Sequence, residues 1–210
     1  MKSVSFAICV SDEIIEIKNL LYFLLENKRK EDEIIVLLDV DSKEKENYYL
    51  VEEYIKNIKD NSLKYFYHSL KKDFGLHKNY LSSLCKKDYI INLDADEIID
   101  KDTLENYYYV IENNDVDLIM VPRVNIVKGI KEEHIERYNW KINEKGYINF
   151  PDYQMRIYRN NKKIVWIRKV HEILYGFDTF QFLPESEEFC IFHIKNIEKQ
   201  IEQNECYMKI

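Results

Sequence analysis

Residues 89–99 constrain the fold of this chain more than any other stretch. Residues 89–93 form an apolar run with a single asparagine, and the acids Asp94, Asp96 and Glu97 follow at once. An apolar run of this length between polar residues is typical of a buried strand in a parallel sheet. Ligands of open α/β sheets bind beyond the carboxyl ends of the strands, so we expect the three acids at a ligand-binding edge.

Length and composition limit the other possibilities. A chain of 210 residues with 46% hydrophobic and 33% charged residues can bury one sizeable core, so we expect a single domain spanning residues 1–210. The formal net charge of −7 argues against a partner nucleic acid bound by phosphate neutralisation, although a local basic patch could hold a diphosphate. No apolar stretch approaches the roughly 20 residues of a membrane helix, which leaves peripheral membrane contact open.

The cysteines indicate a reducing compartment. They lie far apart without a C-x-x-C pair, which favours neither a zinc ribbon nor a disulfide framework. Residues 4–10 are apolar but are followed by acids instead of a small-residue cleavage site, so we interpret them as a first strand and not as a leader. We therefore expect a cytoplasmic protein. The four cysteines are Cys9, Cys85, Cys190 and Cys206.

Strand and helix patterns alternate through the first part of the chain. Helical spacing of apolar residues follows each strand-like run, and Ser11-Asp12 is the predicted N-cap of the first helix. The fifth run is predicted to end at Pro122. Such alternation implies crossover units and an α/β fold with a mostly parallel sheet flanked by helices. The strand-like runs are residues 4–10, 33–38, 64–67, 89–93 and 117–121.

The pattern changes after Pro122. Residues 128–149 are polar, and residues 153–158 and 164–170 are predicted to form an antiparallel hairpin joined at Asn160-Asn161. Residues 189–194 have the composition of a further strand. Apolar residues at Ile197, Ile201 and Met208 predict a terminal helix.

The two aspartates of the acid motif can act on one ligand. Asp94 and Asp96 are two residues apart, so their carboxylates point to the same side of an extended strand end. Hard divalent ions such as Mn²⁺ or Mg²⁺ take oxygen ligands and share them with substrate phosphates. One carboxylate can bind metal while the other accepts a hydrogen bond from a ribose hydroxyl. Alternatively, the acids only end the strand and cap a helix that starts near Asp100.

Several segments together resemble one enzyme family. Residues 93–97 read Leu-Asp-Ala-Asp-Glu, residues 8–13 end a strand in Ser-Asp-Glu, residues 39–42 form the turn Asp-Val-Asp-Ser, and residues 77–80 read His-Lys-Asn-Tyr. They resemble the D-x-D motif, the Asn-Glu turn, the Asp-Asp-Gly-Ser turn and the Arg-Asn helix of the nucleotide-sugar glycosyltransferases of family 2, which have the GT-A fold. The D-x-D segment matches at every residue, whereas Asp12, Val40 and Asp41 depart from the pattern.

Downstream segments resemble one branch of that family. Residues 156–159, Trp166, residues 170–172 and His193 are similar to the branch that contains lipopolysaccharide-core glucosyltransferases. The resemblance implies a nucleotide-sugar-binding half at residues 1–122 and an acceptor-side half at 123–210. It also implies a bacterial surface glycan as the acceptor, made in the cytoplasm with peripheral contact at the inner membrane face.

The resemblance assigns roles on the donor side. It implies that Val10 and Asp12 line the base pocket and that Asp39 contacts the uracil or its ribose. Asp94 would contact the ribose or the metal, and Asp96 would be the principal metal ligand. The donor would be a nucleoside diphosphate sugar, with uridine as the expected nucleoside, and the cofactor Mn²⁺ or Mg²⁺.

Other residues are candidates for the transfer itself. An inverting transfer needs a general base for the acceptor hydroxyl, and Glu172 is our candidate, with Glu97 as its competitor. Arg156 can bind the diphosphate, because its planar fork suits phosphate oxygens. His171 is a candidate contact to diphosphate, metal or acceptor, and His193 is a candidate metal ligand. Each could instead be structural, as a core histidine, a salt bridge or a buried acid.

Three functions are consistent with these features. The first is a metal-dependent, inverting glycosyltransferase that moves a sugar to a glycan or other hydroxyl acceptor. The second is a nucleotidyltransferase that makes sugar nucleotides, but the turn at residues 11–13 lacks the Gly-rich phosphate loop expected there. The third is a binding module that holds a nucleotide sugar without turnover. We expect the first.

Overall fold

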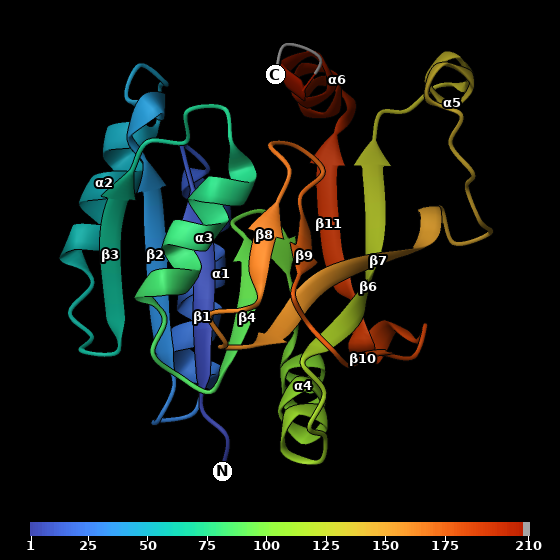
Figure 1. Ribbon diagram of the computed structural model, residues 1–210. Helices are drawn as coiled ribbons and strands as arrows, with labels where there is room; N and C mark the ends of the chain where they lie inside the picture. Colours follow the sequence, from blue (N-terminus) through green and yellow to red (C-terminus); the bar gives the residue numbers. More distant parts are fainter. Residues whose placement is uncertain (208–210) are drawn as a thin grey trace.

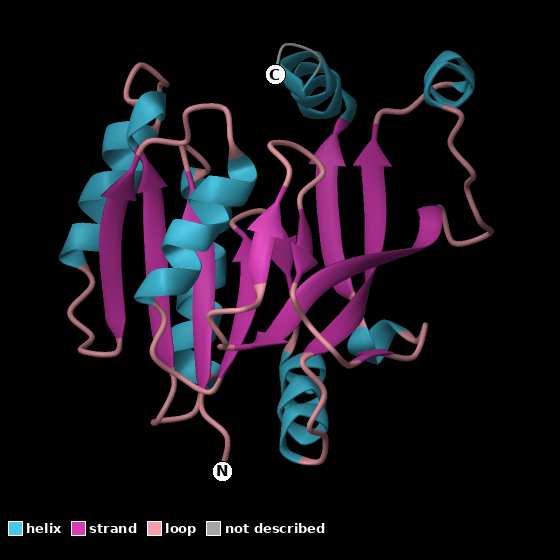
Figure 2. Cartoon of the chain, in the orientation of Figure 1, coloured by secondary structure: helices cyan, strands magenta, loops and turns pink. Residues whose placement is uncertain are grey.

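The computed structural model describes residues 1–207, with side chains to residue 205, as one large sheet packed between helices (Figures 1 and 2). The strand order is β3-β2-β1-β4-β7-β6-β11-β5, and β10 also pairs with β6. The sheet strands are β1 (Val4–Val10), β2 (Glu33–Asp39), β3 (Leu63–His68), β4 (Tyr89–Asp94), β5 (Glu97–Ile98), β6 (Leu118–Lys128), β7 (Ile148–Arg159), β10 (Phe180–Phe182) and β11 (Ile191–Asn196).

The helices cover both faces of this sheet. Apolar side chains of α1, α2 and α4 pack on one face, and α3 packs on the other beside a separate hairpin of β8 (Val165–Ile167) and β9 (Ile173–Tyr175) (Figure 1). The helices are α1 (Ile14–Asn27), α2 (Tyr48–Asn57), α3 (Phe74–Leu84), α4 (Lys101–Glu112), α5 (Glu132–Tyr138) and α6 (Ile197–Tyr207), with 3-10 turns η1 (Val40–Ser42) and η2 (Glu187–Phe189). No helix among the described residues has the length and apolarity to cross a membrane.

The first half confirms the predicted α/β alternation. Strand β1 pairs in parallel with β2 and β4, and β2 pairs in parallel with β3. Every residue of β2 is buried, as expected for a strand covered on both faces. The arrowheads of β2 and β3 point toward the top of Figure 1, so the carboxyl ends of these strands share one edge.

Three local predictions were wrong. The long strand β7 does not pair with β8; it inserts antiparallel between β4 and β6, and β8 pairs with β9 instead. Strand β6 continues through Pro122 to Lys128, because the proline falls between the segments of β6 that pair with β10 and with β11, where no amide donor is needed. The N-cap of α1 is Glu13 rather than Ser11-Asp12, and its carboxylate accepts hydrogen bonds from both of their amides.

The C-terminal segment is also close to its prediction. Strand β11 pairs in parallel with β6 and runs directly into α6, which lies above the carboxyl end of β11 (Figure 1). Met208, predicted to belong to this helix, lies outside the described residues.

The helix α3 is confirmed, but its buried face carries His77, Lys78 and Leu81, whereas Leu76 faces solvent.

Candidate active site

The acid motif lies at the carboxyl edge of the sheet. Asp94 ends β4, and three residues later Glu97 opens the short strand β5, which pairs antiparallel with β11 so that Glu97 lies opposite His193. The Glu97 carboxylate accepts a hydrogen bond from the Asp94 amide at 3.1 Å. This turn presents Asp94 and Asp96 while it draws Glu97 inward, and the Glu97 side chain has no exposed surface.

Asp94 lies against two buried cations. The Arg156 guanidinium contacts both Asp94 and Glu97, and the Lys78 ammonium is 3.6 Å from an Asp94 carboxylate oxygen. Arg123 approaches Glu97 from β6 at 3.3 Å. Burial raises the pKa of Asp94, but the charges of Arg156 and Lys78 outweigh it and hold this pKa well below its ordinary range. Asp94 is therefore a carboxylate at any physiological pH.

A β-bulge aims Arg156 at these acids. The pairing of β6 with β7 shifts between Ile119 opposite Ile157 and Met120 opposite Met155, which leaves Arg156 as the extra residue on β7. A bulge adds one unpaired residue to a strand and redirects its side chain. Arg156 is only 3% exposed, so its guanidinium lies beneath the acid motif.

Asp96 has different surroundings. The Nε2 atom of His193 is 3.3 Å from Asp96 Oδ2, and the Lys199 ammonium of α6 is 3.5 Å from the same oxygen. Burial raises the pKa of Asp96, but the hydrogen bond and charge of His193 more than offset this and lower it to about 2. A second acid of the motif is thus ionised, and it faces an imidazole and an ammonium rather than a guanidinium.

The orientation of His193 is fixed from behind. The Asn125 amide donates to Asp152 at 2.8 Å, which turns Asn125 Oδ1 toward His193 Nδ1 at 3.1 Å. His193 therefore donates from Nδ1. Its Nε2 donates to Asp96 Oδ2 when the ring is charged, and presents a lone pair to the same oxygen when the ring is neutral. Two electron-pair donors facing each other suit a cation between them.

This donor set fits a divalent metal only with help from a ligand. A carboxylate and a neutral imidazole are suitable ligands for Mn²⁺. Within residues 1–207, no three His, Cys, Asp or Glu side chains gather closely enough to hold a metal ion on their own. A metal at Asp96 and His193 would need further oxygens, which a diphosphate carries.

Glu172 joins the site through a lysine. The Lys78 ammonium donates to Glu172 Oε1 at 2.6 Å and lies 4.8 Å from the centroid of the Trp166 ring. Burial lowers the pKa of Lys78, but Asp94 and Glu172 outweigh it and raise this pKa above its ordinary value. Lys78 thus links the acid motif on β4 to the segment that precedes β9.

The segment before Glu172 has a constrained backbone. Arg168 and His171 both have positive φ angles, of 75° and 51°. The amide of Phe74, at the start of α3, donates to the Lys169 carbonyl at 2.9 Å, and a Cβ on Gly75 would lie 2.5 Å from the Arg168 carbonyl oxygen. Close packing against α3 therefore sets the position of Glu172, while the His171 side chain is exposed.

The residues predicted for the base pocket lie at the same edge. Val10 ends β1, and its neighbour Cys9 pairs in register with Asp94. Asp39 ends β2 and accepts hydrogen bonds from the amides of Asp41 and Leu70, both at 3.0 Å, so it stabilises the turn after β2.

Asp12 lies just beyond the end of β1 and forms an ion pair with Lys45 at 3.0 Å. Neighbouring parallel strands therefore bring Val10, Asp12 and Asp39 to the edge that carries the acid motif.

Sequence reasoning missed several members of the site. Lys78 could have been found, because it is a charged residue at a helical position where burial is expected, on the inner face of α3. Arg123 and Asp152 form a 2.7 Å ion pair beside Glu97, and nothing in their sequence context marked them. The missed residues are Lys78, Arg123, Asn125, Asp152 and Lys199.

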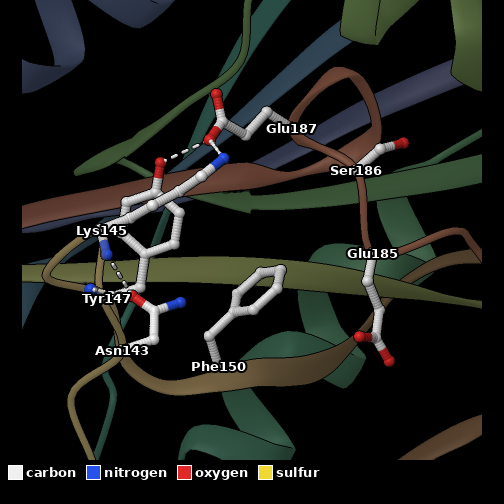
Figure 3. A pocket seen from close by; sticks show the side chains of 7 residues that line it. All are labelled: Asn143, Lys145, Tyr147, Phe150, Glu185, Ser186 and Glu187. Atoms are coloured by element: carbon white, nitrogen blue, oxygen red, sulfur yellow. Dashed lines mark hydrogen bonds and ion pairs between the residues drawn. The ribbon is translucent and has the colours of Figure 1, made fainter.

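A separate hollow is lined by residues between 143 and 187 (Figure 3). Its wall is fixed where the Lys145 ammonium and the Tyr147 hydroxyl both donate to Glu187 at 2.7 Å. Phe150 lies in the middle of this hollow in Figure 3. The lining residues are Asn143, Lys145, Tyr147, Phe150, Glu185, Ser186 and Glu187, so the hollow is distinct from the acid motif.

The sheet, with the acids at its carboxyl edge, has a GT-A-like fold. Residues 5–202 match the family model described as Glycosyl transferase family 2, and the chain belongs to this family. A comparison with curated proteins gave no match.

Solved structures support the fold. The crystal structure of S. aureus TarS 1-349 has a TM-score of 0.61 and 15% identity, over 92% of this chain and 60% of that one. TarS 1-349 in complex with UDP has the same TM-score and identity, over 99% and 64%. Its complex with UDP-GlcNAc has a TM-score of 0.55 and 15% identity, over 90% and 60%. This chain thus spans less than two thirds of these neighbours.

Proposed function

We propose that this chain is a metal-dependent, inverting glycosyltransferase that moves a sugar from a uridine diphosphate sugar to an acceptor hydroxyl. The observation that carries the proposal is the facing pair of Asp96 Oδ2 and His193 Nε2 at 3.3 Å, beside the anchored Asp94. Family membership supports a nucleotide-sugar donor. The TarS neighbours crystallised with UDP and with UDP-GlcNAc support uridine as the nucleoside.

The two halves of the chain would divide the work. Residues 1–122 would hold the donor, with Val10 and Asp12 beside the base, Asp39 toward the uracil or ribose, and Asp94 toward the ribose. Residues 123–210 would face the acceptor. His171 is exposed beside Glu172 and would meet the acceptor or the diphosphate.

Asp96 and His193 would hold Mn²⁺ or Mg²⁺, which neutralises charge on the departing diphosphate. The chain's own residues prepare this site. Asn125 fixes the imidazole tautomer, and Arg156 holds Asp94 and Glu97 in place. Because the guanidinium of Arg156 is buried between two acids, we assign it to positioning the motif rather than to direct phosphate binding.

Glu172 would act as the general base. The Glu172 side chain is 17% exposed, whereas the Glu97 side chain is fully buried and already contacts guanidinium groups. The Glu172 carboxylate would take the proton of the acceptor hydroxyl as the acceptor oxygen attacks the anomeric carbon. The bond from that carbon to the diphosphate breaks on the opposite face, which inverts the configuration.

The acceptor is proposed from the resemblance to the lipopolysaccharide-core branch. A hydroxyl of a bacterial surface glycan would meet the donor in the cytoplasm, with peripheral contact at the inner membrane face. The hollow of Figure 3 lies in the half assigned to this acceptor.

Donor hydrolysis tests the reaction class. With Mn²⁺ and a panel of uridine diphosphate sugars, we expect slow release of uridine diphosphate that is lost on chelation and falls at least about a hundredfold in Asp96→Ala. Asp102→Ala, on the exposed first turn of α4, is the matched control and should keep full release.

Two other outcomes would reject the proposal. Binding of uridine diphosphate sugars without turnover, even with acceptor extracts, would indicate a binding module. Release of pyrophosphate from a nucleoside triphosphate and a sugar phosphate would indicate a nucleotidyltransferase.

A further inference from the structure

The ammonium of Lys199 lies where a donor-bound metal site would form. Its Nζ atom is 3.5 Å from Asp96 Oδ2 and 3.5 Å from Glu16 Oε1 of α1. Strand β11 continues directly into α6, so His193 and Lys199 reach Asp96 from consecutive elements. The Lys199 side chain is 41% exposed, which leaves its long stem free to move.

This contact cannot persist unchanged beside a bound metal. A divalent ion lies about 2.0–2.2 Å from a carboxylate oxygen, so an ammonium near the same oxygen would be repelled by the ion. A diphosphate would bring new negative charge to the same place. Rotation of the Lys199 side chain alone can exchange one partner for the other, because its ion pairs with Asp96 and Glu16 are both long, at 3.5 Å.

The neighbouring lysine cannot take this role. Lys195 is buried, and its ammonium donates to Gln203 at 2.6 Å. This hydrogen bond runs from β11 to α6 and ties the two elements together. Lys199 is thus the lysine that is both paired with Asp96 and exposed.

We propose that Lys199 is a donor-binding residue that changes partners. In the free protein it neutralises Asp96, and when a divalent cation and a nucleoside diphosphate bind, it leaves Asp96 and contacts the diphosphate. This inference rests on the proposed function, because it takes Asp96 as a metal ligand. It makes α6 part of the donor site.

Two binding measurements on Lys199→Gln test the exchange. Mn²⁺ alone, followed by the electron paramagnetic resonance signal of the free ion, should bind about two- to fivefold more tightly than to the wild type, because the competing charge is gone. Uridine diphosphate at saturating Mn²⁺, followed by calorimetry, should bind about tenfold more weakly. Lys199→Arg should restore diphosphate binding, and Lys101→Gln, on the exposed start of α4, should change neither affinity.

Affinities that weaken together, or that both stay unchanged in Lys199→Gln, would overturn the inference. A purely structural lysine gives the first result, since a displaced α6 would disturb metal and nucleotide sites alike. The proposed function fails separately. If the wild type binds neither Mn²⁺ nor uridine diphosphate, or if Asp96→Asn keeps wild-type Mn²⁺ affinity, both the proposed function and this inference are rejected. A wild type that passes both tests leaves the Lys199 result to decide the inference alone.

Discussion

The two aspartates of the motif are two residues apart in sequence and differ in their surroundings. Asp94 rests on the buried cations Arg156 and Lys78, whose guanidinium and ammonium are permanently charged at neutral pH. Asp96 faces His193 and the half-exposed Lys199, at 3.3 and 3.5 Å. Asp94, with 36% of its side-chain surface exposed, therefore contacts two permanent cations, whereas Asp96, 18% exposed, has longer contacts to an imidazole and to a half-exposed lysine.

Asp94 shows how pairing with buried cations fixes a side chain, and Asp96 shows how weaker pairing leaves a carboxylate able to bind a ligand. A buried ion pair costs desolvation and is recovered only by close geometry, so its members are held in one place. An ion pair to a half-exposed lysine, such as that of Asp96 with Lys199, costs less to break. The first arrangement suits a residue that orients a ligand, and the second suits a residue that coordinates one.

Removing the buried cation beside Asp94 should have the largest effect on stability. Arg156→Met removes the cation shared by Asp94 and Glu97 and leaves both buried acids without it. We expect a loss of about 3–5 kcal/mol in the free energy of unfolding, measured by urea denaturation at pH 7. Arg159→Met, three residues further on β7, removes a side chain that is 34% exposed and pairs with Asp117 at 3.3 Å and Asp115 at 3.7 Å, so it should cost less than about 1 kcal/mol. Equal losses in the two variants would contradict the comparison.

Substitutions of the two candidate bases should affect different properties, turnover for Glu172 and stability for Glu97. Glu172→Gln should lower donor turnover at least about a hundredfold, because the amide cannot accept the acceptor proton, while uridine diphosphate affinity stays near that of the wild type. Glu97→Gln should instead lower the free energy of unfolding, since Glu97 is buried against Arg156 and Arg123. Turnover by Glu172→Gln at the wild-type rate would assign the base to another group.

Packing of α3 against the Glu172 segment should have an intermediate effect. In Gly75→Ala, the new Cβ would lie 2.5 Å from the Arg168 carbonyl oxygen, so the backbone that leads to Glu172 must shift. We expect a loss of about 1–3 kcal/mol, read from the thermal midpoint and from urea denaturation. Ser83→Ala, on the exposed side of the same helix, is the control and should leave stability nearly unchanged. If Gly75→Ala matches this control, the segment is more adaptable than its packing indicates.

The pH dependence of stability should be the smallest effect and should report on Asp96. Its folded pKa of about 2 is below its unfolded value of about 3.9, so its contribution is present above the unfolded pKa and is lost as the pH falls toward the folded one. The stability difference between wild type and Asp96→Asn should therefore shrink by roughly 1 kcal/mol between pH 7 and pH 3, measured by urea denaturation. A difference that stays constant over this range would show that His193 and Lys199 do not stabilise the ionised form.

Sequence patterns predicted the elements of the first half because local periodicity is enough for them. Residues 4–10 coincide with β1, and residues 89–93 extend by one residue to give β4. The apolar runs and the helical spacing that separates them specify parallel crossovers. With the strand direction known, the acids had to lie at the carboxyl edge, and they do.

Local patterns could not predict pairing across the second half. Strand β7 looks like the first arm of a hairpin, because a turn follows it at Asn160-Asn161, yet it inserts between β4 and β6. Which strand fills the gap beside β4 depends on the whole sheet and not on any single segment. This insertion also places Arg156 below the acid motif instead of at a solvent-facing diphosphate.

The fold class, the resemblance to a glycosyltransferase family and the edge on which Asp94 and Asp96 lie could all be predicted from sequence. The different cation partners of the two acids follow from tertiary packing. The reason is physical, because charge pairing acts through space over a few ångströms. Arg156, His193 and Lys199 reach these acids from β7, β11 and α6, which lie more than 50 residues further along the chain than β4.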